Sequence, residues 1–248
     1  MLKTGLVSVT FRNLGVEDIA KAANKASLDC IEWGGDVHVP PLDESAASLA
    51  KKVSLENGIR IASYGSYYRC LGTDEEAENE IKTAAMLGAP NIRIWAGKLW
   101  SNDYDDAGRK VMVDSIRRVC VTAAKYGITV SPEFHQATLT DTYKSAVQLI
   151  EEVAEENFRM YWQPNQFEDD EYNLNAIKAV LPYLSNVHVF SWSGNDKFPL
   201  VDGERMWKQY LDIIRSDGKD HNLLLEFVCD GTVEQLYRDA ETLHEWIK

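Results

Sequence analysis

The feature that most restricts the fold is a regular alternation of two kinds of segment, which runs through the whole sequence. Short apolar or β-branched runs are followed by longer segments whose apolar residues recur three and four positions apart, the spacing of a helix face. In three cases a glycine (Gly58, Gly88 or Gly127) ends the helical segment, as is common where a helix closes in a left-handed conformation. Strict alternation of strands and helices predicts parallel strands joined by helical crossovers.

Eight such units fit into the 248 residues. This number and length match a closed (β/α)₈ barrel, for which about 250 residues are typical. An open, doubly wound sheet is the alternative, but it usually carries a glycine-rich phosphate loop after its first strand, which residues 11–15 lack. We therefore expect the α/β class and one TIM-barrel domain over residues 1–248. The expected strands cover residues 5–10, 30–33, 59–63, 91–95, 128–133, 159–163, 186–190 and 222–227, and the expected helices cover 17–23, 44–56, 75–87, 108–126, 142–155, 171–182, 204–215 and 232–247.

Charge and composition exclude several classes of partner. The net charge of −13, from 26 basic and 39 acidic residues, argues against nucleic-acid binding, which needs a basic surface to displace counterions from phosphates. No apolar run is long enough for a membrane span. The first residues do not resemble a signal peptide, so we expect a cytoplasmic protein with a small-molecule substrate. The four cysteines show no CxxC spacing, and whether the chain forms a homodimer stays open.

Metal-capable side chains stand at the ends of four consecutive predicted strands. They are Glu133, Gln163, His188 and Glu226. Catalytic groups of a (β/α)₈ barrel lie at the carboxyl ends of its strands. Glu226 follows three leucines, where an unpaired buried carboxylate would cost several kcal/mol, so it needs a partner. Two carboxylates and an imidazole suit a divalent cation. A structural ion pair and a core histidine are the alternatives.

At these residues the chain resembles the xylose-isomerase-like sugar isomerase and epimerase superfamily, which includes ketose 3-epimerases, hydroxypyruvate isomerase and inosose dehydratase. The resemblance covers the whole chain and is carried by Glu133-x-His135 on strand five, His188 on strand seven and Glu226 on strand eight. Glu32 on strand two and the segment 92–97 on strand four add to it.

The resemblance implies one divalent metal (Mn, Mg, Co or Zn) held by Glu133, Gln163, His188 and Glu226. It also implies that Glu133 and Glu226 act as an acid/base pair beside a carbonyl, while the metal polarises the substrate oxygens. Strand six departs from the family pattern, because Gln163 and Gln166 stand where Asp and His are usual. A neutral ligand at 163 weakens the expected affinity for a hard cation.

Further polar and aromatic side chains are expected around the mouth of the barrel. Arg93 shares a strand face with Trp95 and needs an acid inside the barrel, for which Glu32 is the expected partner. Tryptophan rings at strand ends suit stacking on a sugar, and ordinary core packing is the alternative. The expected substrate-binding residues are His135, Trp95, Trp33, Tyr67, Arg69, Gln166 and Lys197.

Three functions remain open at this point. The leading interpretation is a sugar isomerase or epimerase that transfers a proton next to a carbonyl. A lyase that dehydrates a keto-polyol uses the same acid/base chemistry. A non-catalytic sugar-binding barrel that has lost its metal chemistry would explain Gln163 and Gln166.

Overall fold

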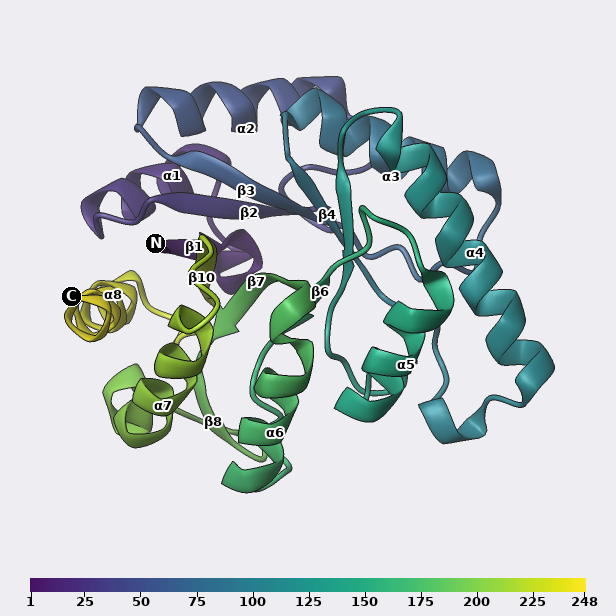
Figure 1. The fold of residues 1–248 in the computed structure, drawn as a ribbon. Helices are drawn as coiled ribbons and strands as arrows, with labels where there is room; N and C mark the ends of the chain where they lie inside the picture. The colour runs from purple at the N-terminus through teal and green to yellow at the C-terminus, as the bar shows by residue number, and fades with distance from the viewer.

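A computed structural model describes all residues, 1–248, and shows a (β/α)₈ barrel in which helices surround the strands (Figure 1). Each predicted strand and helix overlaps an observed one. The strands of the barrel are β1 (Leu2–Val7), β2 (Cys30–Gly34), β3 (Arg60–Gly65), β4 (Asn91–Ile94), β5 (Thr129–Pro132), β6 (Met160–Trp162), β7 (Leu184–Val189) and β10 (His221–Leu225). The helices are α1 (Val16–Lys25), α2 (Glu44–Glu56), α3 (Asp74–Leu87), α4 (Asp106–Ala124), α5 (Tyr143–Val153), α6 (Asp170–Val180), α7 (Glu204–Arg215) and α8 (Val233–Ile247).

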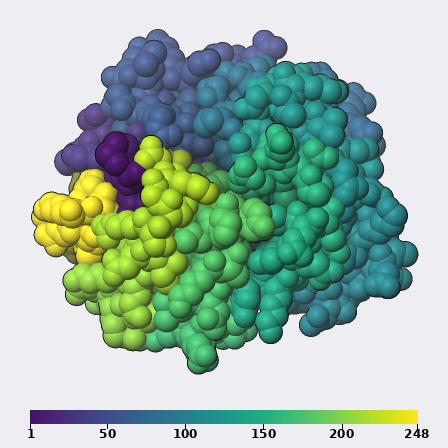
Figure 2. All heavy atoms as spheres, in the orientation of Figure 1, coloured from purple at the N-terminus to yellow at the C-terminus, as the bar shows by residue number.

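All neighbouring strands of the barrel run parallel, in the order β5-β4-β3-β2-β1-β10-β7-β6. The pairing of β1 with β10 joins the two ends of the chain, and Oγ1 of Thr4 lies 3.1 Å from Nε2 of His244 on α8. Figure 2 shows the N-terminal residues and the last helix side by side. Between β5 and β6 the barrel closes through one isolated bridge, from Val130 to Phe158.

Helix ends follow local sequence signals. Thr73 and Glu76 form a reciprocal capping box at the start of α3, and Gly88 ends that helix in a left-handed conformation with a φ of 79°. Asp43 and Asp105 cap α2 and α4 by accepting a hydrogen bond from a backbone amide. No helix is both long and apolar enough to cross a lipid bilayer.

Two apolar clusters follow from the alternation of side chains along each strand. The larger one, of 60 buried residues, fills the space between the strands and the helices. The smaller one, of six residues, includes Val7, Cys30 and Leu224 on the opposite strand faces. A hydrogen-bonded polar layer accompanies it, in which Asn91 bonds Ser63 and Ser131. The interior of the barrel is therefore a packed core beneath the strand ends, as in other barrels of this type.

The sequence did not predict the short hairpin between β7 and α7. It consists of β8 (Ser191–Ser193) and β9 (Asp196–Phe198), which pair antiparallel around Gly194 with a φ of 57°. Short 3₁₀ helices, η1 (Ser8–Phe11), η2 (Ser101–Asp103), η3 (Leu181–Tyr183) and η4 (Leu200–Gly203), complete the connections.

Candidate active site

The four side chains expected as metal ligands converge at the carboxyl ends of β5, β6, β7 and β10. Nδ1 of His188 lies 2.9 Å from Oε1 of Gln163, 3.3 Å from Oε2 of Glu226 and 3.5 Å from Oε1 of Glu133. One ligand atom from each of Glu133, His188 and Glu226 lies within 4.8 Å of the other two. All three residues are buried. The order of the strands thus brings together four residues that are far apart in the sequence.

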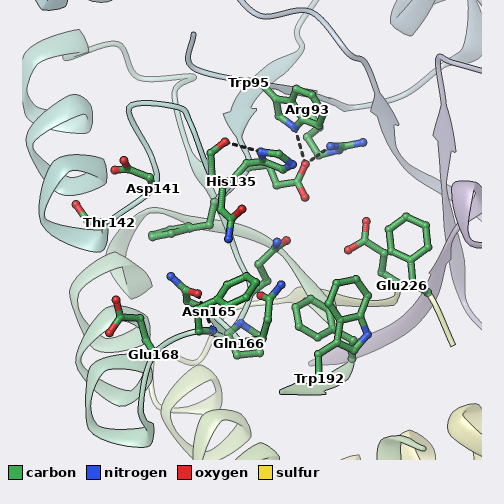
Figure 3. A pocket seen from close by; sticks show the side chains of 18 of the residues that line it. Arg93, Trp95, His135, Asp141, Thr142, Asn165, Gln166, Glu168, Trp192 and Glu226 are labelled. Atoms are coloured by element: carbon green, nitrogen blue, oxygen red, sulfur yellow. Dashed lines mark hydrogen bonds and ion pairs between the residues drawn. The ribbon is translucent and has the colours of Figure 1, made fainter. Parts of the chain in front are cut away.

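Arg93 lies beside this group and contacts two carboxylates at once. Its Nε donates a 2.9 Å hydrogen bond to Oε1 of Glu32, as the sequence indicated. Its Nη1 also donates to Oε2 of Glu133, which the sequence did not indicate. The indole Nε1 of Trp95 donates to the same Glu133 oxygen at 2.7 Å. Oε2 of Glu133 is therefore held by two donors, and Figure 3 shows both contacts as dashed lines.

Burial, nearby charges and hydrogen bonds shift the pKa values of Glu133 and His188. Burial by itself would raise the pKa of Glu133, but the Arg93 charge and hydrogen bonds from His188 and Trp95 hold this pKa below its ordinary value. Burial by itself would lower the pKa of His188, yet the surrounding carboxylates, Glu226 first, raise it well above its ordinary value. The cluster therefore favours ionised carboxylates and attracts positive charge.

The donor set fits a divalent cation. Glu32, Glu133 and Glu226 are buried carboxylates and Arg93 is the one guanidinium among them, so the formal charges of these four side chains sum to −2. The raised pKa of His188 favours a proton there, which offsets one of the two charges, whereas a dication that replaces this proton would offset both. An uncompensated buried charge is costly, and a dication would balance this one. Oxygen ligands with one imidazole suit Mg, Mn, Co or Zn.

A cavity of about 770 Å³ opens above the cluster. Glu133, Gln163 and Glu226 line it, and His188 lies beneath them with a side chain that is 0% exposed. Four of the seven expected substrate-binding residues line the same cavity: Tyr67, Trp95, His135 and Gln166. The His135 ring stacks on Trp95 with ring centres 4.3 Å apart.

The other three expected substrate-binding residues do not line the cavity. Trp33 was wrongly placed at the mouth, because its ring is 0% exposed in the core and donates to Oγ of Ser54 at 3.0 Å. Arg69 lies behind Trp95, with its guanidinium 4.1 Å from the ring centre. Lys197 is exposed on the hairpin, and its Nζ lies 4.8 Å from the ring centre of Trp192.

Several residues that line the cavity were not expected from the sequence. Trp100, Asn102 and Asp103 follow β4, and Asn165 and Phe167 follow β6. Strand periodicity carries no information about such loops, so only the polar and aromatic composition of 100–103 and 165–168 could have drawn attention to them.

Phe227, directly after Glu226, has a φ of 50°. A bulky side chain rarely adopts this left-handed conformation, and such strain is concentrated at functional sites. Its amide donates to Oγ1 of Thr10 at 3.0 Å, which holds the strained turn in place. The turn fixes the backbone that carries Glu226, and the Phe227 ring forms a wall of the cavity.

Comparisons with known proteins agree with this fold. The family model described as xylose isomerase-like TIM barrel matches residues 20–248. Among curated proteins, a 3-dehydroshikimate dehydratase from Bacillus anthracis is 23% identical over 206 residues, which cover 79% of this chain and 74% of that protein.

Solved structures show the same fold at low sequence identity. A probable 3-DHS dehydratase from Bacillus anthracis superposes with a TM-score of 0.81 at 20% identity, over 98% of this chain and 99% of that one. A D-allulose 3-epimerase from Methylomonas sp. has a TM-score of 0.74 at 14% identity, over 99% and 98% of the two chains. A xylose isomerase domain protein from Planctomyces limnophilus has a TM-score of 0.77 at 15% identity, over 99% and 95%.

Proposed function

The chain belongs to the xylose isomerase-like TIM barrel family, and we propose that it removes a proton from a carbon next to a carbonyl group in a polyhydroxylated substrate. The convergence of Glu133, Gln163, His188 and Glu226 beneath one cavity is the observation that carries this proposal. A base within reach of the substrate and a positive charge on the carbonyl oxygen are the two requirements of such a step.

Glu226 is the better placed of the two glutamates to take the proton. It lines the cavity, and His188 is the one side chain that forms an ion pair with its carboxylate. One oxygen of Glu133, in contrast, is already held by Arg93 and Trp95. We therefore assign Glu226 as the base and give Glu133 the role of a fixed anionic ligand, in place of the symmetric acid/base pair that the family resemblance implied.

A single base has a chemical consequence. Epimerisation at one carbon requires groups on both faces of that carbon, whereas a single carboxylate can move a proton between adjacent carbons on one face. The arrangement therefore favours isomerisation over epimerisation. The divalent cation that Glu133, Gln163, His188 and Glu226 would hold polarises carbonyl and hydroxyl oxygens when it is bound.

Dehydration is the second candidate, because a curated relative is a 3-dehydroshikimate dehydratase. Its first step is the same removal of a proton by Glu226. The electrons of the C–H bond then form a C=C bond, the neighbouring C–O bond breaks, and the departing hydroxide takes the proton from Glu226 and leaves as water.

Proton exchange with solvent tests the proposal directly. The protein is incubated with Mg²⁺ in D₂O, together with panels of ketoses, aldoses and hydroxylated keto acids. NMR should show deuterium next to the carbonyl of at least one compound, and the product distinguishes rearrangement from loss of water. Glu226→Gln should slow exchange by about 10²–10⁴-fold, while the control Glu234→Gln, on α8, should not. Binding of a sugar without any exchange would instead support the non-catalytic barrel.

A further inference from the structure

The cavity is much larger than the reacting part of the proposed substrate requires. Its volume is about 770 Å³, whereas a six-carbon sugar occupies roughly 200 Å³ at the packing density of organic crystals. Figure 3 shows that the cavity extends sideways from Glu226, past His135 and Asn165, to Asp141 and Glu168. A substrate held at Glu226 therefore leaves this second end of the cavity free.

We call this end the outer lobe, and it is lined by Trp100, Asn102, Asp103, Asp141, Phe167 and Glu168. Two of its residues are exposed aromatics, since Trp100 is 48% and Phe167 51% exposed. Both belong to loops at the carboxyl ends of strands, on the same face as the catalytic cluster. Rings of this kind offer a flat, rigid apolar surface with little conformational entropy to lose.

The polar side chains of this region have unused hydrogen-bonding capacity. Those of Asn102, Asp103, Gln136, Gln166 and Glu168 line the cavity, and the structure shows no hydrogen bond or ion pair from any of them to another protein group. The amides offer donors and acceptors, and the carboxylates offer acceptors. A ligand with many hydroxyl groups, each both donor and acceptor, matches this mixture.

Charge excludes a phosphate or carboxylate in the outer lobe. The basic residues that line the cavity are Arg12 and Arg93. Arg12 is paired with Asp36 at 2.7 Å, and Arg93 with Glu32 and Glu133. Neither is available to an anion beside Asp103, Asp141 and Glu168. An amine would suit the carboxylates but would leave the amide N–H donors unused.

We propose that the outer lobe binds a second sugar ring of the substrate, an inference that rests on the proposed function. The substrate class is then a glycoside-sized carbohydrate with a carbonyl-bearing unit over Glu226 and a neutral ring between Trp100 and Phe167. The aromatic rings contact the C–H faces of that second ring, and the amide and carboxylate groups bind its hydroxyls.

Ligand-observed NMR tests this with the protein loaded with Mg²⁺, which is diamagnetic. The probes are D-fructose and four disaccharides that contain fructose: maltulose, isomaltulose, turanose and lactulose. At least one disaccharide should bind tenfold or more tightly than D-fructose, with saturation transferred to both of its rings. Trp100→Ala and Phe167→Ala should each remove most of this advantage and the transfer to the non-ketose ring. Their affinity for D-fructose should be unchanged.

Tyr126→Ala is the matched control, because Tyr126 is an exposed aromatic (43%) in a helix-to-strand loop, at the opposite end of the barrel. Thermal unfolding checks that all variants fold. Equal affinities for D-fructose and every disaccharide, or an advantage that survives both substitutions, would overturn the outer-lobe proposal even where proton exchange is observed. Tight binding of an amine such as putrescine with no disaccharide binding would also overturn it. If the disaccharides bind through the lobe but no exchange occurs, the proposed reaction fails and the lobe assignment stands.

Discussion

Arg93 and Glu133 form an ion pair inside the barrel, where their side chains are 3% and 5% exposed. Because Arg93 also binds Glu32, one guanidinium compensates two buried carboxylates. Its pKa lies well above its ordinary value: burial opposes the charged form, but the carboxylates outweigh burial. Loss of this one side chain would therefore leave two carboxylates without their main partner.

We expect Arg93→Met to reduce the free energy of unfolding by about 3–5 kcal/mol, the usual cost of breaking a buried ion pair. Urea denaturation measures this. Arg118→Met is the control, since Arg118 and its partner Asp74 are 54% and 77% exposed, and it should change stability by no more than about 0.5 kcal/mol. Similar effects of the two substitutions would show that the buried pair has no special energetic role.

Tyr161 supports the same cluster from below. Its hydroxyl donates to Oε2 of Glu32 at 2.5 Å and accepts from Nδ2 of Asn186 at 2.8 Å. Tyr161→Phe leaves both groups buried with one partner fewer, so we expect a loss of about 1–3 kcal/mol. The control is Tyr183→Phe, which removes a hydroxyl that makes no hydrogen bond to the protein. Chemical denaturation should show a lower stability for Tyr161→Phe than for Tyr183→Phe. Equal stabilities would contradict the supporting role of Tyr161.

Gln163→Asp should increase the affinity for Mn²⁺. Gln163 lies 2.9 Å from Nδ1 of His188 through a neutral oxygen, and a carboxylate there would add ligand charge, which strengthens binding of hard cations. We expect a gain of about tenfold or more in calorimetric titration. Gln166→Asp places the same charge in the same cavity without contact to His188. An equal gain in both variants would mean that general charge, not ligation, is responsible.

Stability should depend on pH through Glu80 on α3. Burial raises the pKa of Glu80 to about 7, a rise that the nearby Tyr64 hydroxyl only partly offsets, and its Oε2 has no hydrogen-bond partner. The folded state thus binds a proton that the unfolded state releases above about pH 4.5. The contribution to stability is complete below pH 4.5 and is lost as pH rises through about 7.

Glu80→Gln keeps the shape of the protonated side chain. We expect it to match the wild type near pH 4.5 and to be more stable at pH 8 by roughly 2–3 kcal/mol. Urea denaturation at both pH values measures the difference, with Glu78→Gln, on the exposed side of the same helix, as the control. A difference that is the same at both pH values would contradict a buried, titrating Glu80.

The alternation of segments was sufficient to predict the barrel, since each crossover helix is long and each strand is strongly apolar. Strand ends were also sufficient to predict Glu133, Gln163, His188 and Glu226 as neighbours. Trp33 was misplaced although the same alternation places it opposite Glu32: successive side chains of a strand point to opposite faces, and Glu32 faces Arg93 inside the barrel.

Loops account for what the sequence did not predict. The hairpin at 191–198 depends on a turn at Gly194, and the outer lobe combines residues from the loops after β4, β5 and β6. Such positions are set by tertiary packing and by turn geometry rather than by any periodic pattern. The second contact of Arg93, with Glu133, also required coordinates, because sequence spacing does not tell which of two acids lies nearer.

The backbone pairing between β5 and β6 is incomplete, and two of the proposed metal ligands lie beside it. Glu133 directly follows β5 and Gln163 directly follows β6. A cation bound by both side chains would therefore link these two strands where their backbone pairing is incomplete. Binding of the cation and pairing of β5 with β6 would then be linked equilibria. The loaded protein would resist local opening there, and amide hydrogens of both strands would exchange more slowly with solvent.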